Sequence, residues 1–275
     1  MDDHTNIPHR SSDGSAGDAD YGSIGAGYSK YRQPEPAFAE AIDAALGDVA
    51  TLLNVGAGSG SYEPIGLDVT PVEPSAAMRA QRPPNAAPAI DAVAEHLPFP
   101  DLAFDASLAS FTVHQWQDLG AGLREMRRVT RGPVVILTCD PAALSRSWLN
   151  EYAPEVIETE AQRYPAITDI QDALGGTVRV TTLPIPLHCV DGFSEAYYGR
   201  PEALLDPGAR RANSAWSFVD TRVEERFTRA LRADLETGSW DARHGHLRTQ
   251  ATFDGSLRII VATSSGERST RSGEA

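Results

Sequence analysis

Three glycines separated by single residues follow a short apolar run, in Gly-Ala-Gly-Ser-Gly at residues 56–60. Glycine lets the backbone turn sharply and lets a ligand approach where a β-carbon would clash. An acid, Glu73, follows in Val-Glu-Pro-Ser at residues 72–75. A carboxylate at the end of a second strand can accept hydrogen bonds from the vicinal hydroxyls of a ribose. The pair predicts a nucleoside site; the alternatives are a tight turn and a surface acid.

The glycine run differs from the loops that bind phosphate. The dinucleotide pattern needs a glycine where this sequence has Ser61, and it needs a helix that opens there. Pro64 and Gly66 leave room for about one helical turn. No lysine lies nearby, which excludes the loop that holds a nucleoside triphosphate. The loop therefore departs from the dinucleotide pattern and is not one that holds a nucleoside triphosphate.

Candidates for proton transfer and acceptor binding stand further along the chain. His114 follows a predicted strand, and an imidazole can act as a base near neutral pH; packing against the next helix is the alternative. Trp116 is a flat wall for an aromatic acceptor or a core residue. His188 is a second candidate for substrate contact, and Trp148 and Tyr197 belong to a set of aromatic residues that suits an apolar small molecule.

The elements that must position these residues alternate between strands and helices. A stripe at Phe38, Ile42 and Leu46 predicts a helix that Gly47 ends. A second helix is predicted from Leu119 to Val129. Apolar runs predict strands at 50–55, 69–73, 87–92, 104–111 and 133–139. This alternation predicts an α/β, Rossmann-like sheet that is mostly parallel.

The alternation stops after Asp140. We expect a helical cap from residues 141–177 and 188–246, interrupted by an edge strand at 177–187. Apolar residues recur every four positions from 219 to 235 and predict a long helix ended by Gly238. Residues 247–253 and 257–261 flank Asp-Gly at 254–255, which predicts an antiparallel terminal hairpin. The expected sheet has seven strands.

Composition narrows the class of protein. The 275 residues include 24 Lys and Arg against 38 Asp and Glu, a net charge of −14, which disfavours a nucleic-acid partner. Two cysteines make no disulfide framework, which favours the cytoplasm, and no apolar run is long enough for a membrane span. Residues 1–20 and 264–275 are predicted to be disordered, around one domain at 21–263. Oligomeric state is not predicted, and no metal is expected.

Four motifs in order resemble the class I S-adenosylmethionine-dependent methyltransferases, in particular the small-molecule branch similar to ubiquinone/menaquinone and trans-aconitate methyltransferases. They are Leu-Asn-Val-Gly-Ala-Gly-Ser-Gly at 53–60, Val-Glu-Pro-Ser-Ala-Ala-Met at 72–78, Ala-Glu-x-Leu-Pro-Phe at 94–99 and Phe-Asp at 104–105. An N-terminal segment, residues 24–32, resembles the lid of the same branch. The resemblance implies methyl transfer to O, N or C of a small, partly apolar or aromatic metabolite.

The resemblance also implies a cofactor site for S-adenosylmethionine. The methionine part would lie on the glycine loop, and the ribose would contact the acid. The adenine would face the Ala-Glu pair, and the sulfonium would lie at the exit of the fourth strand. The implied cofactor residues are Tyr28, Arg32, Asn54, Gly56, Ala57, Gly58, Glu73, Pro74, Met78, Ala94, Glu95, Ser110 and Phe111. The implied acceptor region contains His114 and Trp116.

Three departures from the family pattern affect details of the site. Asn54 stands where the family usually has an acid, Val93 stands where an acid often precedes the Ala-Glu pair, and the link from the loop to Glu73 is short. Two other functions fit the strand–glycine–acid arrangement: a nicotinamide-linked oxidoreductase and a non-catalytic S-adenosylmethionine-binding protein. Ser61 and the lack of a Tyr-x-x-x-Lys pair disfavour the first; the intact glycine loop disfavours the second.

Overall fold

A computed structural model describes residues 28–264, with side chains from Lys30 onward. The strands are β1 Thr51–Val55, β2 Asp68–Val72, β3 Ala106–Ser110, β4 Val134–Cys139, β5 Thr177–Thr182, β6 Ile185–Pro186, β7 Thr252–Phe253 and β8 Leu257–Thr263. The α-helices are α2 Tyr28–Tyr31, α3 Pro36–Leu46, α4 Ala76–Arg79, α5 Leu119–Val129, α6 Leu149–Tyr152, α7 Pro154–Arg163, α8 Ile167–Leu174, α9 Pro207–Arg211, α10 Thr221–Thr237 and α11 Ser239–His244. Short 3-10 helices cover Val113–Gln115, Pro141–Arg146, Ser194–Tyr197, Pro201–Leu205, Ser214–Phe218 and Gly245–Thr249.

A six-stranded sheet in the order β2-β1-β3-β4-β8-β5 forms the centre of the molecule. β1, β2, β3 and β4 pair in parallel, whereas β8 runs antiparallel between β4 and β5. The parallel strands end on one side, so the segments that follow β1, β2 and β3 meet there. This mixed sheet confirms the predicted Rossmann-like α/β class.

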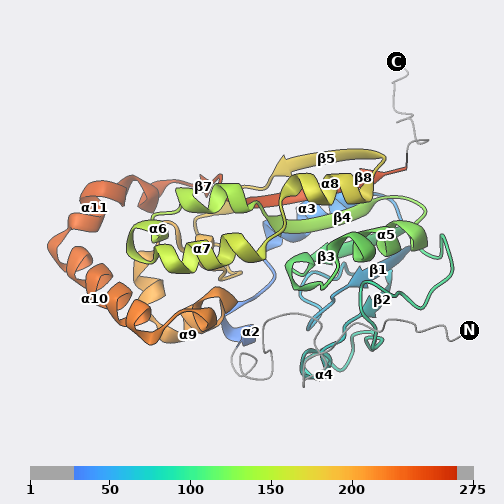
Figure 1. Ribbon diagram of the computed structural model, residues 1–275, viewed down its shortest axis with the longest axis horizontal. Coiled ribbons are helices and arrows are strands. Elements are labelled where there is room, and N and C mark those ends of the chain that lie inside the picture. Colours follow the sequence, from blue (N-terminus) through green and yellow to red (C-terminus); the bar gives the residue numbers. More distant parts are fainter. Residues whose placement is uncertain (1–27, 265–275) are drawn as a thin grey trace, which may run out of the picture.

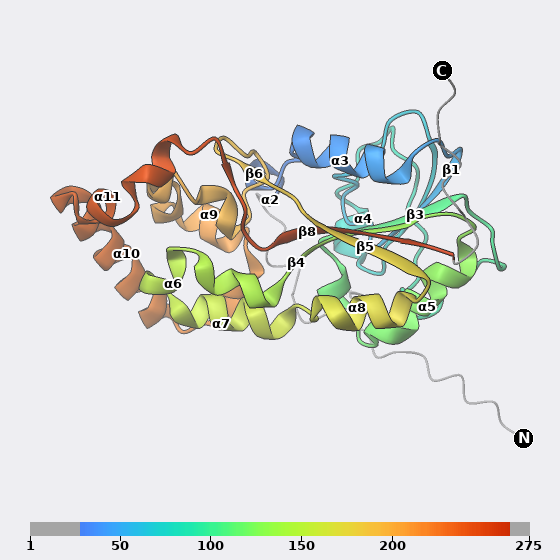
Figure 2. The same cartoon turned by 90° about the horizontal axis from the view of Figure 1, so that it is seen from above.

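Helices cover both faces of the sheet. In Figure 2 α3 lies on one face, and α5 and α8 lie on the other. Phe38 and Ile42 of α3 are fully buried on the first face, and Leu123 and Met126 of α5 are fully buried on the second. Gly47 ends α3 as predicted, with a φ of 70°, and Asp118 caps the start of α5 by accepting from the backbone N–H of Ala121.

The helical cap lies at one end of the molecule, beside the carboxyl ends of the parallel strands (Figure 1). It comprises α6, α7, α9, α10 and α11, and α10 ends at Gly238 as predicted. Large buried aromatics fill it, including Trp148, Trp216 and Trp240. These residues belong to the same apolar cluster as the buried residues of α3. The expectation that all of 141–177 joins the cap is wrong for α8, because Ile170 and Leu174 pack with the α5 side of the sheet.

The predicted strand count of seven is wrong, because the sheet has six strands. Residues 87–92 form only a bridge, in which Ile90 lies parallel to Val72. The Ile90 N–H donates to the Pro71 carbonyl over 2.9 Å, and its carbonyl accepts from the Glu73 N–H over 3.0 Å. Pro88 lacks an N–H to extend this ladder, so the pairing stops after one residue.

The predicted terminal hairpin is also wrong. β7 pairs with β6 in a separate two-stranded sheet, whereas β8 enters the main sheet. Most of residues 247–253 precede β7 as a 3-10 helix and a bend. Ser256 marks the crossing: it is fully buried and its N–H donates to the Glu195 carboxylate over 2.9 Å. The Asp-Gly pair therefore redirects the chain from one sheet to the other.

Most of the predicted disordered tails, residues 1–20 and 264–275, lies outside the described residues, as do residues 24–27 of the lid-like segment. Within residues 28–264, no helix has the length and apolar character that a membrane crossing requires.

Candidate active site

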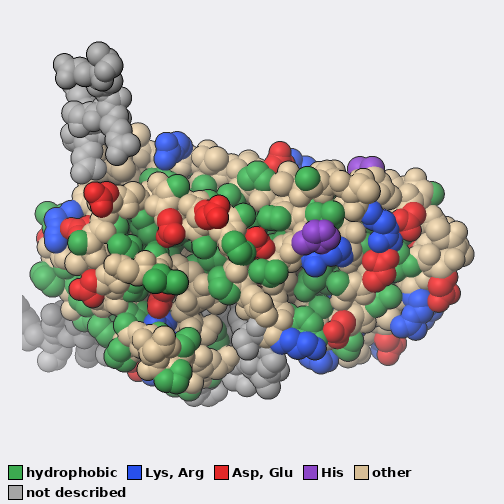
Figure 3. Space-filling view, turned by 180° about the vertical axis from the view of Figure 1, so that it is seen from behind, with side chains coloured by type: hydrophobic (Ala, Val, Ile, Leu, Met, Phe, Trp, Pro, Cys, Tyr) green, Lys and Arg blue, Asp and Glu red, His purple; other side chains and the backbone are tan. Residues whose placement is uncertain are grey.

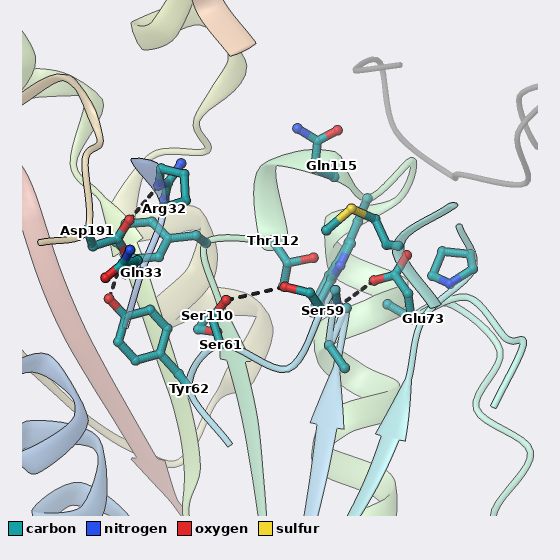
Figure 4. A pocket seen from close by; sticks show the side chains of 18 residues that line it. Arg32, Gln33, Ser59, Ser61, Tyr62, Glu73, Ser110, Thr112, Gln115 and Asp191 are labelled. Atoms are coloured by element: carbon teal, nitrogen blue, oxygen red, sulfur yellow. Dashed lines mark hydrogen bonds and ion pairs between the residues drawn. The ribbon is translucent and has the colours of Figure 1, made fainter. Parts of the chain in front are cut away.

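A pocket of about 930 Å³ opens where β1, β2 and β3 end, and we call it the strand-end pocket (Figure 4). Its walls come from the glycine loop, the end of β2, the exit of β3 and the residues after α2. The lining residues are Arg32, Gln33, Gly56, Ala57, Gly58, Ser59, Ser61, Tyr62, Glu73, Pro74, Met78, Ala94, Ser110, Phe111, Thr112, Gln115, Trp116 and Asp191.

The glycine loop forms the floor of this pocket. The N–H groups of Gly56 and Ala57 both donate to the Val72 carbonyl over 2.9 Å, which holds the loop against β2. Gly56 has a φ of 69°, and a β-carbon there would lie 2.0 Å from Thr112 Oγ1. Only glycine satisfies both constraints, so this position is fixed by the backbone and by its close neighbour.

Glu73 is buried at the end of β2 and points toward the loop (Figure 4). Oε2 accepts from the Gly58 N–H over 2.8 Å, and Oε1 accepts from the Ser75 N–H over 2.8 Å. Burial raises the pKa of the carboxyl, and these two hydrogen bonds oppose the rise. Each oxygen of a carboxylate can accept two hydrogen bonds, so each retains capacity for one more donor.

Asn54 lies at the end of β1 and is buried. Its Nδ2 donates to Glu63 Oε1 over 3.0 Å, and Glu63 pairs with Arg82 over 2.7 Å. Within residues 28–264 Asn54 Oδ1 is buried and accepts no hydrogen bond. Asn54 thus lies beside the pocket rather than in its lining, and it leaves an acceptor near the loop.

Arg32, Asp191 and Tyr62 connect three segments that are distant in sequence (Figure 4). Asp191 Oδ1 accepts from Arg32 Nε, and Asp191 Oδ2 accepts from the Tyr62 hydroxyl over 2.7 Å. The backbone of Arg32 also forms an antiparallel bridge with Asp191. Burial, together with the Asp191 charge, raises the pKa of the Tyr62 hydroxyl, which keeps it a hydrogen-bond donor. The network holds the chain after α2 against the cap.

Phe111 stands at the exit of β3 with a φ of 52°, which is unusual for a residue with a β-carbon. Its ring centroid lies 5.7 Å from that of Phe193, and the Arg32 guanidinium lies 5.4 Å from it. Strained residues held in place by their surroundings concentrate at functional sites. Phe111 and Arg32 line both the strand-end pocket and a second cavity, so the two spaces adjoin here.

We call this second space, of about 490 Å³, the inner cavity. It lies between the exit of β3, the end of β4 and the cap. The lining residues are Arg32, Phe111, His114, Cys139, Glu160, Tyr164, Phe193, Ala212, Asn213 and Ser214. The imidazole of His114 packs against the Tyr164 ring with centroids 4.3 Å apart. The candidate base therefore faces the inner cavity.

Most of the residues predicted for the cofactor lie together in the strand-end pocket. Those that line it are Arg32, Gly56, Ala57, Gly58, Glu73, Pro74, Met78, Ala94, Ser110 and Phe111. Trp116 lines it as well, next to Ala94 and Gly122 of α5. The side chain of Tyr28 lies outside the described residues.

Four other predicted residues lie elsewhere. Glu95 Oε1 accepts from the Asp118 N–H over 3.1 Å, which fixes the start of α5. Trp148 is buried in the cap, where its Nε1 donates to the Tyr198 carbonyl over 3.0 Å. Tyr197 is buried with its hydroxyl near Gly192, and His188 is exposed. None of the four lines either cavity, so substrate contact by Trp148, Tyr197 or His188 has no support in this arrangement.

Several residues of the two cavities are absent from the sequence-based prediction. Asp191 comes from an irregular stretch far from the glycine loop, and Glu160 lies on α7 among other charged residues. No local pattern indicates either one. Tyr62 and Thr112 directly follow predicted motifs, so their place next to the ligand loops could have been expected from position.

Comparison with known proteins supports this view of the site. A family model described as "Methyltransferase domain" matches residues 53–137, which include the glycine loop, Glu73, the exit of β3 and most of β4. The uncharacterized protein YafE of Escherichia coli is 47% identical over 38 residues, a match that covers 14% of this chain and 18% of YafE.

Solved structures extend the likeness to the cap. A candidate methyltransferase of an antibiotic biosynthesis pathway from Anabaena variabilis superposes with a TM-score of 0.78 and 28% identity, over 85% of this chain and 99% of that one. A Thermotoga maritima protein described as an S-adenosylmethionine-dependent methyltransferase shares the fold, with a TM-score of 0.51, 14% identity and 86% and 91% coverage. These matches give residues 53–137 a methyltransferase domain and make the chain similar in fold and strand-end geometry to class I S-adenosylmethionine-dependent methyltransferases.

Proposed function

We propose that this protein transfers a methyl group from S-adenosylmethionine to an O, N or C atom of a small, partly apolar or aromatic metabolite. The observation that carries the proposal is the placement of Glu73. Its carboxylate is buried beside the glycine loop, and the backbone N–H groups of Gly58 and Ser75 orient it. The remaining acceptor capacity of its two oxygens matches the two hydroxyls of a ribose.

The rest of the strand-end pocket fits the other parts of the cofactor. Pro74, Met78, Ala94 and Trp116 supply apolar surface for adenosine, since all four line the pocket. We therefore assign Trp116 to the cofactor rather than to the acceptor. Glu95 lies outside the pocket lining, and its contact with the adenine edge, which belongs to the resemblance, stays a prediction.

The opposite end of the cofactor would lie between the loop and the residues after α2. Gly56 and Ala57 leave backbone space for the methionine part, and Arg32 supplies a cation for its carboxylate. Asn54 Oδ1 is the nearby acceptor for its amine. Tyr28, which belongs to the resemblance, stays a prediction.

When bound, S-adenosylmethionine supplies a methyl group on a sulfonium, which is transferred by in-line displacement. The chain's part is to hold the two reactants in line, exclude water and remove a proton where the acceptor carries one. Phe111 would border both reactants, because it lines the strand-end pocket and the inner cavity, whereas Ser110 lines the strand-end pocket. His114 faces the inner cavity and is the proposed base.

The setting of the reaction is part of the proposal. Acidic and basic side chains are interspersed over the cap surface, on the right of Figure 3, unlike the basic stripe that binds a phosphate backbone. With a net charge of −14, this favours a small molecule over a nucleic acid. We propose that residues 21–263 form the methyltransferase domain and that it works in the cytoplasm.

Ligand binding tests the proposal. Isothermal titration of the full chain with S-adenosylhomocysteine should give saturable binding, whereas NADH should give none. Binding of NADH alone would instead favour a nicotinamide-linked oxidoreductase. A screen of metabolites with methyl-labelled S-adenosylmethionine should then transfer label to a small acceptor. Binding without transfer to any acceptor class would favour a non-catalytic role.

A further inference from the structure

We propose that the inner cavity is the acceptor site and that it selects an aromatic or apolar molecule bearing an amine, which pairs with Glu160. This inference rests on the proposed function and names the chemistry of its acceptor.

The position of the inner cavity suits an acceptor. It shares Phe111 and Arg32 with the strand-end pocket, so a molecule inside it would lie next to the bound cofactor. The cap closes it through α7 and the residues after α9, which gives the cap a role in excluding water.

Aromatic rings form much of the wall. Phe111, Tyr164 and Phe193 line the cavity, with the His114 imidazole packed on Tyr164. Such rings stack on a flat apolar ligand, and their faces also attract a cation. Apolar contact alone does not distinguish an amine from an alcohol, so the selection must come from the polar groups.

Glu160 is the polar group that has capacity for a ligand. It lies on α7, half-buried, and its side chain lines the cavity. Within residues 28–264 no hydrogen bond reaches its carboxylate: the nearby cations are engaged elsewhere, with Arg32 on Asp191 and Arg163 on Ser214 over 2.8 Å. A carboxylate that faces a cavity and accepts no hydrogen bond is stabilised by a ligand that supplies a hydrogen-bond donor.

Two other polar groups of the cavity already have partners. Both N–H groups of Asn213 donate, to the carbonyls of Gly192 and Ala209, over 3.0 and 2.9 Å. Ser214 accepts from Arg163. Glu160 is the one carboxylate among the described residues that line the cavity, so a cationic donor on the ligand would pair with it.

Electrostatics favour a cationic donor in particular. Burial raises the pKa of Glu160, although Arg163 and Arg32 oppose the rise. A second buried carboxyl, Glu195, interacts with Glu160 and has a pKa of about 7 for the same main reason, burial. A protonated amine next to Glu160 would stabilise its charged form, which a neutral alcohol would do much less.

The test uses two probes of the same shape, 2-phenylethylamine and 2-phenylethanol, titrated into the full chain saturated with S-adenosylhomocysteine. We expect the amine to bind at least ten-fold more tightly, a difference of about 1.4 kcal/mol. Glu160→Gln should reduce this ratio to near one. Glu158→Gln, on the exposed face of the same helix, should keep it.

Equal affinity for the two probes, no binding of the amine, or an unchanged ratio in Glu160→Gln would each overturn the inference. Should Glu160→Gln fail to fold, Glu160→Asp retracts the carboxylate and should lower the ratio. S-adenosylhomocysteine binding is measured first in every variant. Its absence in the wild type contradicts the proposed function, whereas its presence without an amine preference contradicts only the acceptor class.

Discussion

The strand-end pocket and the cap depend on different kinds of interaction. At the strand ends, hydrogen bonds from backbone N–H groups hold the structure: Gly56 and Ala57 donate to Val72, and Gly58 and Ser75 donate to Glu73. In the cap, packing of large side chains holds the structure, as between Trp148 and Trp240, whose rings meet edge to face at 5.7 Å. The first kind is specified by short motifs, and the second by pairs of residues distant in the chain.

The comparison implies that the cap can lose stability while the strand-end pocket keeps its ligand affinity. Trp240→Ala tests this most strongly, because the side chain is fully buried between Trp148 and His244. We expect the free energy of unfolding to fall by about 3–5 kcal/mol. The dissociation constant of S-adenosylhomocysteine, measured by calorimetry below the melting point, should change less than about three-fold.

Phe218→Ala is the matched control, since that ring is 45% exposed and its loss should cost less than about 1 kcal/mol. Abolished S-adenosylhomocysteine binding in folded Trp240→Ala would show that the two regions are coupled.

Glu73→Ala should do the reverse and affect binding more than stability. It removes the carboxylate that Gly58 and Ser75 orient, and with it the acceptors for a ribose. Loss of two hydrogen bonds to a charged group predicts about 100-fold weaker binding of S-adenosylhomocysteine by calorimetry. Glu63→Gln, beside the loop but outside the pocket lining, should bind within about three-fold of the wild type. An unchanged affinity in Glu73→Ala contradicts the ribose assignment.

Substitutions at two glycines of the same region distinguish the effect of a steric clash from the effect of backbone strain. Gly56 and Gly66 have φ values of 69° and 92°, but only at Gly56 would a β-carbon meet another atom, Thr112 Oγ1 at 2.0 Å. Gly66→Ala should cost about 1–2 kcal/mol of stability from strain alone. Gly56→Ala should cost more and also weaken S-adenosylhomocysteine binding, as thermal melts with and without the ligand can measure. Equal effects at both positions would mean that the Thr112 contact is unimportant.

The smallest expected effect is a pH dependence in the cap. Burial raises the pKa of Glu195 to about 7, against the hydrogen bonds from Ser256. Because the folded-state pKa lies above the ordinary value, its stabilising contribution is present at acidic pH and is lost as the pH rises through 7. The melting temperature should therefore fall between pH 6 and pH 8, by roughly 2–4 °C for each kcal/mol of unfolding free energy that is lost.

Glu195→Gln, which stays neutral, should flatten this slope, whereas Glu236→Gln on the exposed side of α10 should not. A slope that is the same in wild type and Glu195→Gln would assign the pH dependence to other groups.

The same contrast explains how much the sequence could predict. Helices α3, α5 and α10 and the strands β1 to β4 follow from periodicity and capping residues such as Gly47, Asp118 and Gly238. Most of the cofactor residues follow from motifs that lie at strand ends. These features depend on residues within a few positions of one another, so short sequence patterns are enough to predict them.

The remaining features depend on tertiary structure. Asp-Gly at 254–255 has the chemistry of a hairpin, yet buried Glu195 holds Ser256 and sends the next strand into the main sheet. Asp191 and Glu160 reach the two cavities only because the cap folds back over the strand ends. Trp148 resembles a substrate-binding aromatic in composition, but its burial beside Tyr198 makes it cap core.

The antiparallel position of β8 has a consequence for the nascent chain. β8 is flanked by β4 and β5, and β5 pairs with no other strand of the described chain. During translation β5 leaves the ribosome long before β8, with its backbone N–H and C=O groups unpaired in the interim. Helices α9, α10 and α11 of the cap are synthesised in between, so the last strand joins the sheet only after all the helices of the cap exist.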